Sequence, residues 1–308
     1  MSIIKIRDKD GNIVDIPVLK GKDYNLTNED KLNLANEVLT LINEAECIPL
    51  GSAVSKLPQI IDRTVTELTA EDLAGVMTIG KYAFYECSKL TNVMIPDSVT
   101  NIGNDVFKGC ASLMNVNVPD GVKSISDSLF NGCSSLKSIT IPNSVTRIGS
   151  YAFCDCSSLT SVTIPDNVTF ISMYAFLNCS NLKSITIPDS VTSIGSTVFG
   201  RCTSLTSIRI GNGIKSIGNN TFESCTSLTS VTIPDSIASM PFGMFKSCSN
   251  LTNVRIGNGI TSINSNAFQN CTSLTDIYID KPEDSISGAP WGATNATIHW
   301  NTPLPSEE

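Results

Sequence analysis

The chain has 308 residues, a formal net charge of −8 and 41% hydrophobic residues. An acidic surface would repel a phosphate backbone, and nucleic-acid-binding proteins usually carry clustered Lys and Arg, so we expect no binding to DNA or RNA. No apolar run approaches the roughly 18 to 20 residues of a membrane-spanning helix, and residues 1–20 do not show a signal peptide's apolar stretch. We therefore expect no membrane insertion and no recognisable export signal.

The N-terminal segment is predicted to form a β-hairpin followed by a helix. Residues 3–16 contain two alternating apolar runs on either side of Asp10 and Gly11, a pattern typical of a hairpin. Apolar residues then recur at helical spacing between Leu32 and Ile42. We predict a small α+β attachment module over residues 1–45, whose thin core favours docking on a second copy or on a larger assembly. Residues 46–70 are predicted to be a linker or shoulder.

One motif inside this segment suggests what the assembly is. Residues 20–31, K-G-K-D-Y-N-L-T-N-E-D-K, resemble the start of tail-fibre and baseplate appendage proteins of Firmicutes phages, in which a hairpin and a helix flank the motif. The resemblance implies that residues 1–45 bind virion tail or baseplate proteins, and that the protein is displayed on a virion without a signal peptide of its own.

A period of 23 residues dominates the rest of the chain. Phenylalanine recurs at this step from Phe84 to Phe268, and cysteine recurs at it from Cys87 to Cys271. A fixed period of this length indicates a solenoid, in which each coil buries its apolar row only when it is stacked on its neighbours. We predict a solenoid over residues 71–280, which favours a binding protein because it offers a long repeated surface and no single deep pocket.

Each coil is predicted to contain a strand, a corner and a return segment. The stretch S-V-T-I at residues 161–164 alternates polar and apolar side chains, which indicates one strand of a long parallel sheet. The P-D pair after it makes a corner, because proline cannot donate to the ladder and aspartate favours a turn. The return segment on the convex side is predicted to be short and irregular, with a turn of 3₁₀ helix. G-N-G replaces P-D in two coils, and we interpret it as a turn, since the coil is too short for a phosphate-binding loop and its helix.

The inward positions resemble a known repeat family. The pattern C-x-x-L-x-x-V-x-I-P-x-x-V-x-x-I-G-x-x-A-F, present over residues 76–280, resembles the BspA-like, or Treponema pallidum-type, leucine-rich repeat. The resemblance implies a leucine-rich repeat solenoid with a parallel strand face and, as in characterised relatives, adhesion to host proteins or to other cells. The family has no common catalytic residue.

The cysteines of the period occupy one inward position and are predicted to form a buried ladder. Coils spaced like paired strands would bring neighbouring sulfurs within bridging range, so disulfides are the alternative to the free, packed thiols that we favour. Cys154 lies outside the period and is interpreted as a loop thiol. The Cys154-Asp155-Cys156 segment lacks the second pair or the histidines of a zinc site, so we expect no metal and no other cofactor.

The outward strand positions supply the candidate binding residues. One column reads Met94, Asn117, Thr140, Thr163, Thr186, Arg209, Thr232, Arg255 and Tyr278. Of these, Thr163, Thr186 and Thr232 suit hydrogen bonding to sugars or to a flat protein surface, although Thr is also an ordinary residue of exposed strands. Arg and Tyr are enriched at binding hot spots, so Arg209, Arg255 and Tyr278 form a candidate contact patch, with solvated strand side chains as the alternative.

Residues 281–308 abandon the period and are predicted to be a C-terminal cap and tail. Trp291 and Trp300 are expected to seal the open core of the last coil. His299 is the chain's single histidine, and it lies far along the sequence from any cluster of reactive Ser or Cys, so we do not expect a His-based triad.

These features predict a protein that is not an enzyme. The repeated aspartates are explained by turn chemistry and show no extra acidic pair of the kind a glycosidase needs. We expect adhesion or receptor binding by a phage tail-associated protein whose solenoid contacts a bacterial surface glycan or protein. The protein is expected in a virion or at a cell surface, with a homo-oligomer formed through the N-terminal module. The alternatives are a virion decoration protein that uses the solenoid as a rigid spacer of roughly 45 to 50 Å, and a bacterial surface adhesin.

Overall fold

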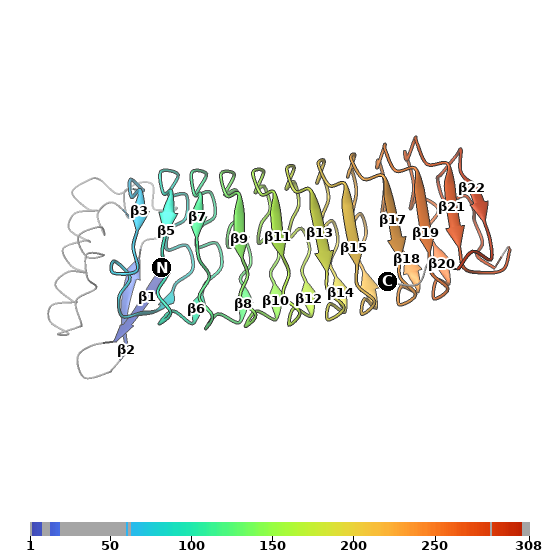
Figure 1. Ribbon diagram of the computed structural model, residues 1–308. Helices are drawn as coiled ribbons and strands as arrows, with labels where there is room; N and C mark the ends of the chain where they lie inside the picture. The colour runs from blue at the N-terminus through green and yellow to red at the C-terminus, as the bar shows by residue number, and fades with distance from the viewer. Residues whose placement is uncertain (1, 8–12, 19–59, 61–62, 284, 304–308) are drawn as a thin grey trace.

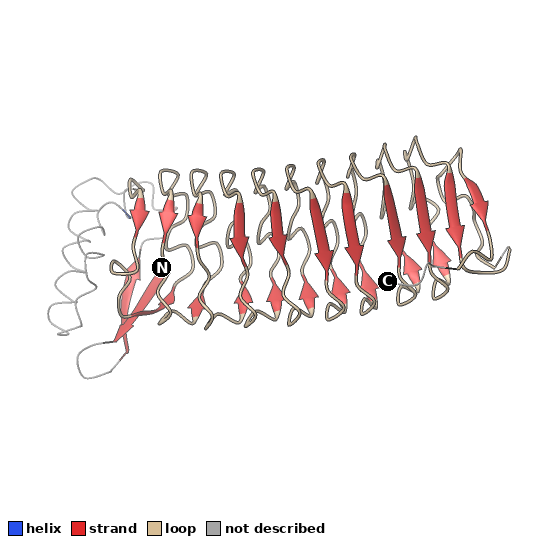
Figure 2. Cartoon of the chain, in the orientation of Figure 1, coloured by secondary structure: helices blue, strands red, loops and turns tan. Residues whose placement is uncertain are grey.

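The structure is a computed structural model that describes residues 2–7, 13–18, 60, 63–283 and 285–303. The helix expected between Leu32 and Ile42, the motif at residues 20–31 and most of the segment 46–70 lie outside the described residues. From residue 63 onward the described chain contains strands, turns and loops and no helix (Figure 2).

The repeats stack into a parallel β-solenoid, as the period predicts (Figure 1). The coils contribute one strand to each of two rows, except that the last two strands of the chain both belong to the first row. The first row consists of β3 (Glu67–Leu68), β5 (Asn92–Val93), β7 (Asn115–Val116), β9 (Ser138–Thr140), β11 (Ser161–Thr163), β13 (Ser184–Ile187), β15 (Ser207–Ile210), β17 (Ser230–Ile233), β19 (Asn253–Ile256), β21 (Asp276–Ile279) and β22 (Thr297–His299). The second row consists of β4 (Val76–Ile79), β6 (Asn101–Ile102), β8 (Ser124–Ile125), β10 (Arg147–Ile148), β12 (Phe170–Ile171), β14 (Ser193–Ile194), β16 (Ser216–Ile217), β18 (Ser239–Met240) and β20 (Ser262–Ile263).

Neighbouring coils are in register, so equivalent residues lie side by side in columns. Ser161 of β11 pairs with Ser138 of β9, and Thr186 of β13 pairs with Arg209 of β15. In β11, Val162 is buried whereas Ser161 and Thr163 are exposed, which is the expected alternation. We call the outward side of the first row, formed in β11 by Ser161 and Thr163 and in other strands by the equivalent residues, the strand face.

A continuous stack of phenylalanine rings runs through the core. The rings of successive coils lie with centroids 5.1 to 5.9 Å apart and with planes within 16° of parallel. All nine rings are at most 1% exposed. The recurring Phe therefore packs against its own copies in the coils on either side, which explains why the step never varies.

The cysteine ladder is buried and its thiols are free, as expected. Each thiol from Cys110 onward donates a hydrogen bond to a phenylalanine carbonyl of the preceding coil, as Cys156 Sγ does to Phe130 O at 3.2 Å. Burial raises the pKa of Cys87 and Cys202 to about 12. Cys154 lies in a turn of the return segment, as expected of a loop thiol, and it is buried: it is 4% exposed and donates to Asp155 Oδ2 at 3.3 Å.

The return segment is short and irregular, and it consists of turns in place of the expected 3₁₀ helix. Tyr151 and Asp155 adopt φ values of 57° and 59°. Their N–H groups donate to Met173 O and Leu177 O of the next coil, at 3.1 and 2.9 Å. In a 3₁₀ helix these N–H groups would bond to carbonyl groups of their own segment. Here they bond to the next coil, so a regular 3₁₀ helix does not form.

Elements outside the repeat lie at both ends of the solenoid. At the N-terminal end, β1 (Ser2–Arg7) and β2 (Ile13–Val18) form the predicted antiparallel hairpin, and β1 also pairs antiparallel with β4 (Figure 1). At the C-terminal end, Trp291 is 1% exposed and Trp300 packs edge-on against it with ring centroids 6.3 Å apart. The predicted tryptophan seal is thus confirmed.

Candidate binding face

The strand face carries short polar side chains over most of its length. Proline or glycine closely follows each strand of the first row from β5 to β19, so these strands stop at the same corner and present equivalent residues in rows. Thr163, Thr186 and Thr232 are all exposed there. They provide hydroxyl groups on β11, β13 and β17 that could bond to a ligand lying across the strands.

The face is hollowed over β11, β13 and β15. A groove of about 610 Å³ is lined by hydroxyl groups of β11 and β13 and by two corner aspartates, Asp166 and Asp189. Thr163, Thr186 and Arg209 all line it, so the structure brings these three predicted residues together. Thr232, Arg255 and Tyr278 do not line this groove.

Arg209 forms an ion pair across one end of the groove. Its Nη1 lies 3.4 Å from Asp189 Oδ1, and both side chains are about half exposed, so the pair adds little to stability. Asp189 Oδ1 also accepts a hydrogen bond from the backbone N–H of Asn212 at 2.9 Å. The Asp189 carboxylate is therefore held in place by the neighbouring turn, and it partly neutralises the charge of Arg209.

A second cluster lies at the C-terminal end of the same face. The Arg255 guanidinium lies 4.6 Å from the centre of the Tyr278 ring, and the Tyr278 ring stacks on the His299 ring at 4.5 Å and 13°. These residues belong to β19, β21 and β22, which pair in order. Arg255 and Tyr278 thus meet as a stack, whereas Arg209 is separated from them by Thr232. We call Arg255, Tyr278 and His299 the C-terminal stack.

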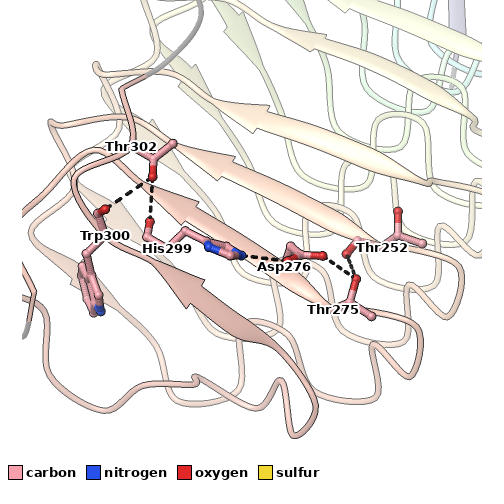
Figure 3. A network of polar contacts seen from close by, with 6 residues as sticks. All are labelled: Thr252, Thr275, Asp276, His299, Trp300 and Thr302. Atoms are coloured by element: carbon pink, nitrogen blue, oxygen red, sulfur yellow. Dashed lines mark hydrogen bonds and ion pairs between the residues drawn. The ribbon is translucent and has the colours of Figure 1, made fainter.

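Asp276 fixes the histidine ring (Figure 3). His299 Nε2 and Asp276 Oδ1 are 2.8 Å apart, and the Thr275 hydroxyl donates to Asp276 Oδ2 at 2.8 Å. These hydrogen bonds, the one from His299 first, lower the pKa of Asp276. The Thr302 hydroxyl donates to His299 O at 3.3 Å and so ties the following residues to β22.

His299 is a surface residue of interest that the sequence reasoning missed. The cap strand breaks the period, since Tyr278 pairs with His299 and not with a residue 23 positions later. The available signal was the stretch T-I-H, which repeats the outward–inward–outward alternation of the other strands.

Partly exposed aromatic residues outside the strand face were also missed. Tyr151 and Tyr174 stack at 4.7 Å, the Arg147 guanidinium lies 5.6 Å from the Phe170 ring centre, and Met173 is 49% exposed. Equivalent positions in most other coils are Ser, Asn or Thr. Aromatic residues in columns that are otherwise polar were the signal.

The described part of the chain offers no metal centre and no membrane span. Within residues 63–283 and 285–303, no three His, Cys, Asp or Glu side chains come together in a way that could hold a metal ion. No helix among the described residues is both long and apolar enough to cross a bilayer.

The chain is similar to several solved bacterial proteins. A leucine-rich cell surface protein from Faecalibacterium prausnitzii is 29% identical, covering 72% of this chain and 75% of its own, with a TM-score of 0.42. The T. pallidum leucine-rich repeat protein is 28% identical, covering 59% and 77%, with a TM-score of 0.46. A leucine-rich repeat protein from Bacteroides ovatus is 24% identical, covering 78% and 84%, with a TM-score of 0.39.

The repeats themselves decide the family. No curated protein matches the chain. The BspA type leucine-rich repeat region matches residues 77–202 and 169–290 in six copies. Repeat solenoids of this kind typically present extended binding surfaces on a non-enzymatic scaffold. Since the match spans more than half of the sequence, the chain belongs to the BspA-type leucine-rich repeat family.

Proposed function

We propose that this protein is a non-enzymatic adhesion protein that binds its partner through the strand face. The observation that supports this most directly is the strand face itself, where the groove and the C-terminal stack lie along one row of stacked strands. Each strand is held by its neighbours in register, so the outward side chains are positioned before any partner arrives. Preorganised side chains lose little conformational freedom on binding.

The proposed partner is a glycan or a protein of a bacterial surface. Rows of hydroxyl groups flanking an Arg–Asp pair can donate to and accept from the hydroxyl and amide groups of such a partner. Under this proposal the protein acts outside the cell, at a cell surface or in a virion.

The virion role belongs to the same proposal and rests on the resemblance of residues 20–31 to phage tail appendage proteins. In this role, residues 1–45 attach to virion tail or baseplate proteins or associate with further copies of the chain. Most of these residues lie outside the described part of the structure. A stable oligomer of the full chain in sedimentation velocity would support the role, and a stable monomer would count against attachment through self-association.

The test of the binding role is the adhesion of the labelled full chain to a panel of intact Gram-positive cells. The site variant carries Arg209→Thr, Arg255→Thr and Tyr278→Thr. The control carries Lys123→Thr and Lys215→Thr, which remove the same charge from exposed positions where equivalent coils already have Thr. We expect saturable binding to some strains, lost in the site variant and kept in the control. If the folded chain binds no strain, adhesion is wrong and a rigid spacer is favoured.

A further inference from the structure

The C-terminal stack differs from the rest of the strand face in the partner of its arginine. Arg209 pairs with Asp189 at 3.4 Å, and Arg147, outside the face, lies 3.9 Å from Asp127. Arg255 instead lies over the Tyr278 ring, and no carboxylate of the described chain is within ion-pair distance of it. Its guanidinium therefore keeps planar N–H donors available, and this geometry matches a carboxylate or a phosphate.

The acid that is bonded to the stack, Asp276, is already engaged. Asp276 accepts from His299 Nε2 and from the Thr275 hydroxyl, both at 2.8 Å. The carboxylate thus opposes the approach of an anion less than a free one would. Its bond to Nε2 also fixes the position of the histidine ring against Tyr278.

The stack is held rigidly. Its three residues stand on paired strands, their flat groups pack on one another at 4.6 and 4.5 Å, and the edge-on tryptophans lie beyond β21 in the cap. Strand spacing places the guanidinium, the phenol and the imidazole in a row at intervals of about 4.8 Å. Rigid elements and mutually packed side chains are what a precise recognition site requires.

We infer that the C-terminal stack recognises an anionic group, a carboxylate or a phosphate, carried by a surface polymer that lies across β19, β21 and β22. Arg255 supplies the charge and the Tyr278 hydroxyl supplies a neighbouring hydrogen-bond donor, while His299 packs on the Tyr278 ring and holds it in place. Asp276 is a positioning residue that acts through His299. The inference rests on the proposed binding role of the strand face and names the chemistry of one part of its partner.

The experiment uses His299 as its own reporter, because the sequence contains one histidine. The imidazole NMR signals of the untagged full chain are followed during titration with poly-L-glutamate, with polyphosphate and with neutral dextran, at 0.15 M salt. We expect a saturable shift with at least one anionic polymer and none with dextran. The polymer that shifts the signals identifies carboxylate or phosphate as the source.

Two arginine variants separate a site from general charge. Arg255→Gln and Arg209→Gln each remove one positive charge from the same column of the strand face. We expect Arg255→Gln to weaken anion binding about tenfold or more, as for loss of a charged hydrogen bond, and Arg209→Gln to leave it nearly unchanged. Equal weakening by both variants, or no shift with either polymer, overturns the inference.

The outcome is distinguishable from failure of the adhesion proposal. Cell binding that is lost in the site variant, together with silent His299 signals, leaves adhesion standing and removes the anion site. Saturable anion binding by a chain that binds no cell would leave the anion site standing and remove the adhesion proposal.

Discussion

At the scale of single residues, the ladder positions have one physical role repeated many times. Cys202 is fully buried, and its thiol donates to Phe176 O at 3.3 Å. The same arrangement recurs from Cys110 to Cys271. Because the ladder thiols share one environment, we expect them all to resist ionisation, and the dependence of folding stability on pH tests this.

The thiols should make folding stability fall in alkaline solution. Burial raises the pKa of Cys87, Cys202 and Cys271 to about 12, against about 8.5 in an unfolded chain. The unfolded state therefore releases these protons first, so stability is intact below about pH 8.5 and declines as pH rises towards 12. Each ladder thiol should contribute about 1.4 kcal/mol per pH unit in that window.

Urea unfolding at pH 7.5 and at pH 10.5 measures this decline. Cys202→Ala should reduce the slope with pH by the share of one thiol, whereas Ser204→Ala, a change at a half-buried residue of the same coil, should not. Rapid reaction of the native ladder with a thiol reagent at neutral pH would contradict the buried arrangement.

At the scale of elements, the corner after each strand decides how closely the coils approach. Where the turn reads G-N-G, a Cβ placed on Gly213 would lie 1.8 Å from the carbonyl oxygen of Asp189 in the previous coil. At the same turn position of an earlier coil, a Cβ on Gly121 would lie 3.1 Å from the methyl group of Thr100. The first contact is with backbone, and the second is with a side chain that can rotate.

Alanine substitutions should therefore separate the two glycines. Gly213→Ala should lower the free energy of unfolding by about 1 to 3 kcal/mol, since it overpacks one coil against the next. Gly121→Ala should change it by less than about 1 kcal/mol, because its neighbour can move and alanine restricts the unfolded chain. Thermal and urea unfolding of both variants measure the difference, and equal losses would show that the close approach at Gly213 is not decisive.

The N-terminal hairpin is also best understood as an element. Its strand β1 pairs with β4, so the hairpin extends the second row and covers an edge that would otherwise be open. If residues 1–45 attach to a partner, they do so while β1 remains paired with β4 at the end of the solenoid.

At the scale of the whole molecule, stability is expected to be a sum of coils and of the interfaces between them. The phenylalanine stack makes this visible, because an interior ring has a neighbour on each side. Phe176 stacks on Phe153 at 5.1 Å and on Phe199 at 5.4 Å, whereas Phe84 begins the stack and meets Phe107 alone among the stacked phenylalanines, at 5.5 Å.

Phe176→Ala should lower the free energy of unfolding by about 3 to 5 kcal/mol, as for other buried aromatic residues. Phe84→Ala should lower it by less, and the difference should approach the value of one stacked pair, about 0.5 to 1.5 kcal/mol. Urea unfolding measures both, with Thr186→Ala on the exposed strand face as the neutral control. A larger loss for Phe84→Ala would contradict the additive description.

The fold was readable from the sequence because its cause is periodic. A residue that recurs every 23 positions falls at the same place in every coil, so Phe, Cys and the strand alternation together specify a solenoid with buried ladders and an exposed strand face. The hairpin and the tryptophan cap were also readable, since turn residues and a lost period are local signals. The burial of Cys154 was not, because it stands outside every column.

The sequence by itself determined the solenoid, the inward ladders and which residues point outward from the strands. The tertiary structure alone decided which outward residues meet: Thr163, Thr186 and Arg209 in one groove, and Arg255, Tyr278 and His299 in another cluster. Burial imposes a pattern on inward residues that the sequence must repeat in every coil. Outward residues obey no such constraint, so their partners depend on the register between coils and on a cap strand that leaves the period.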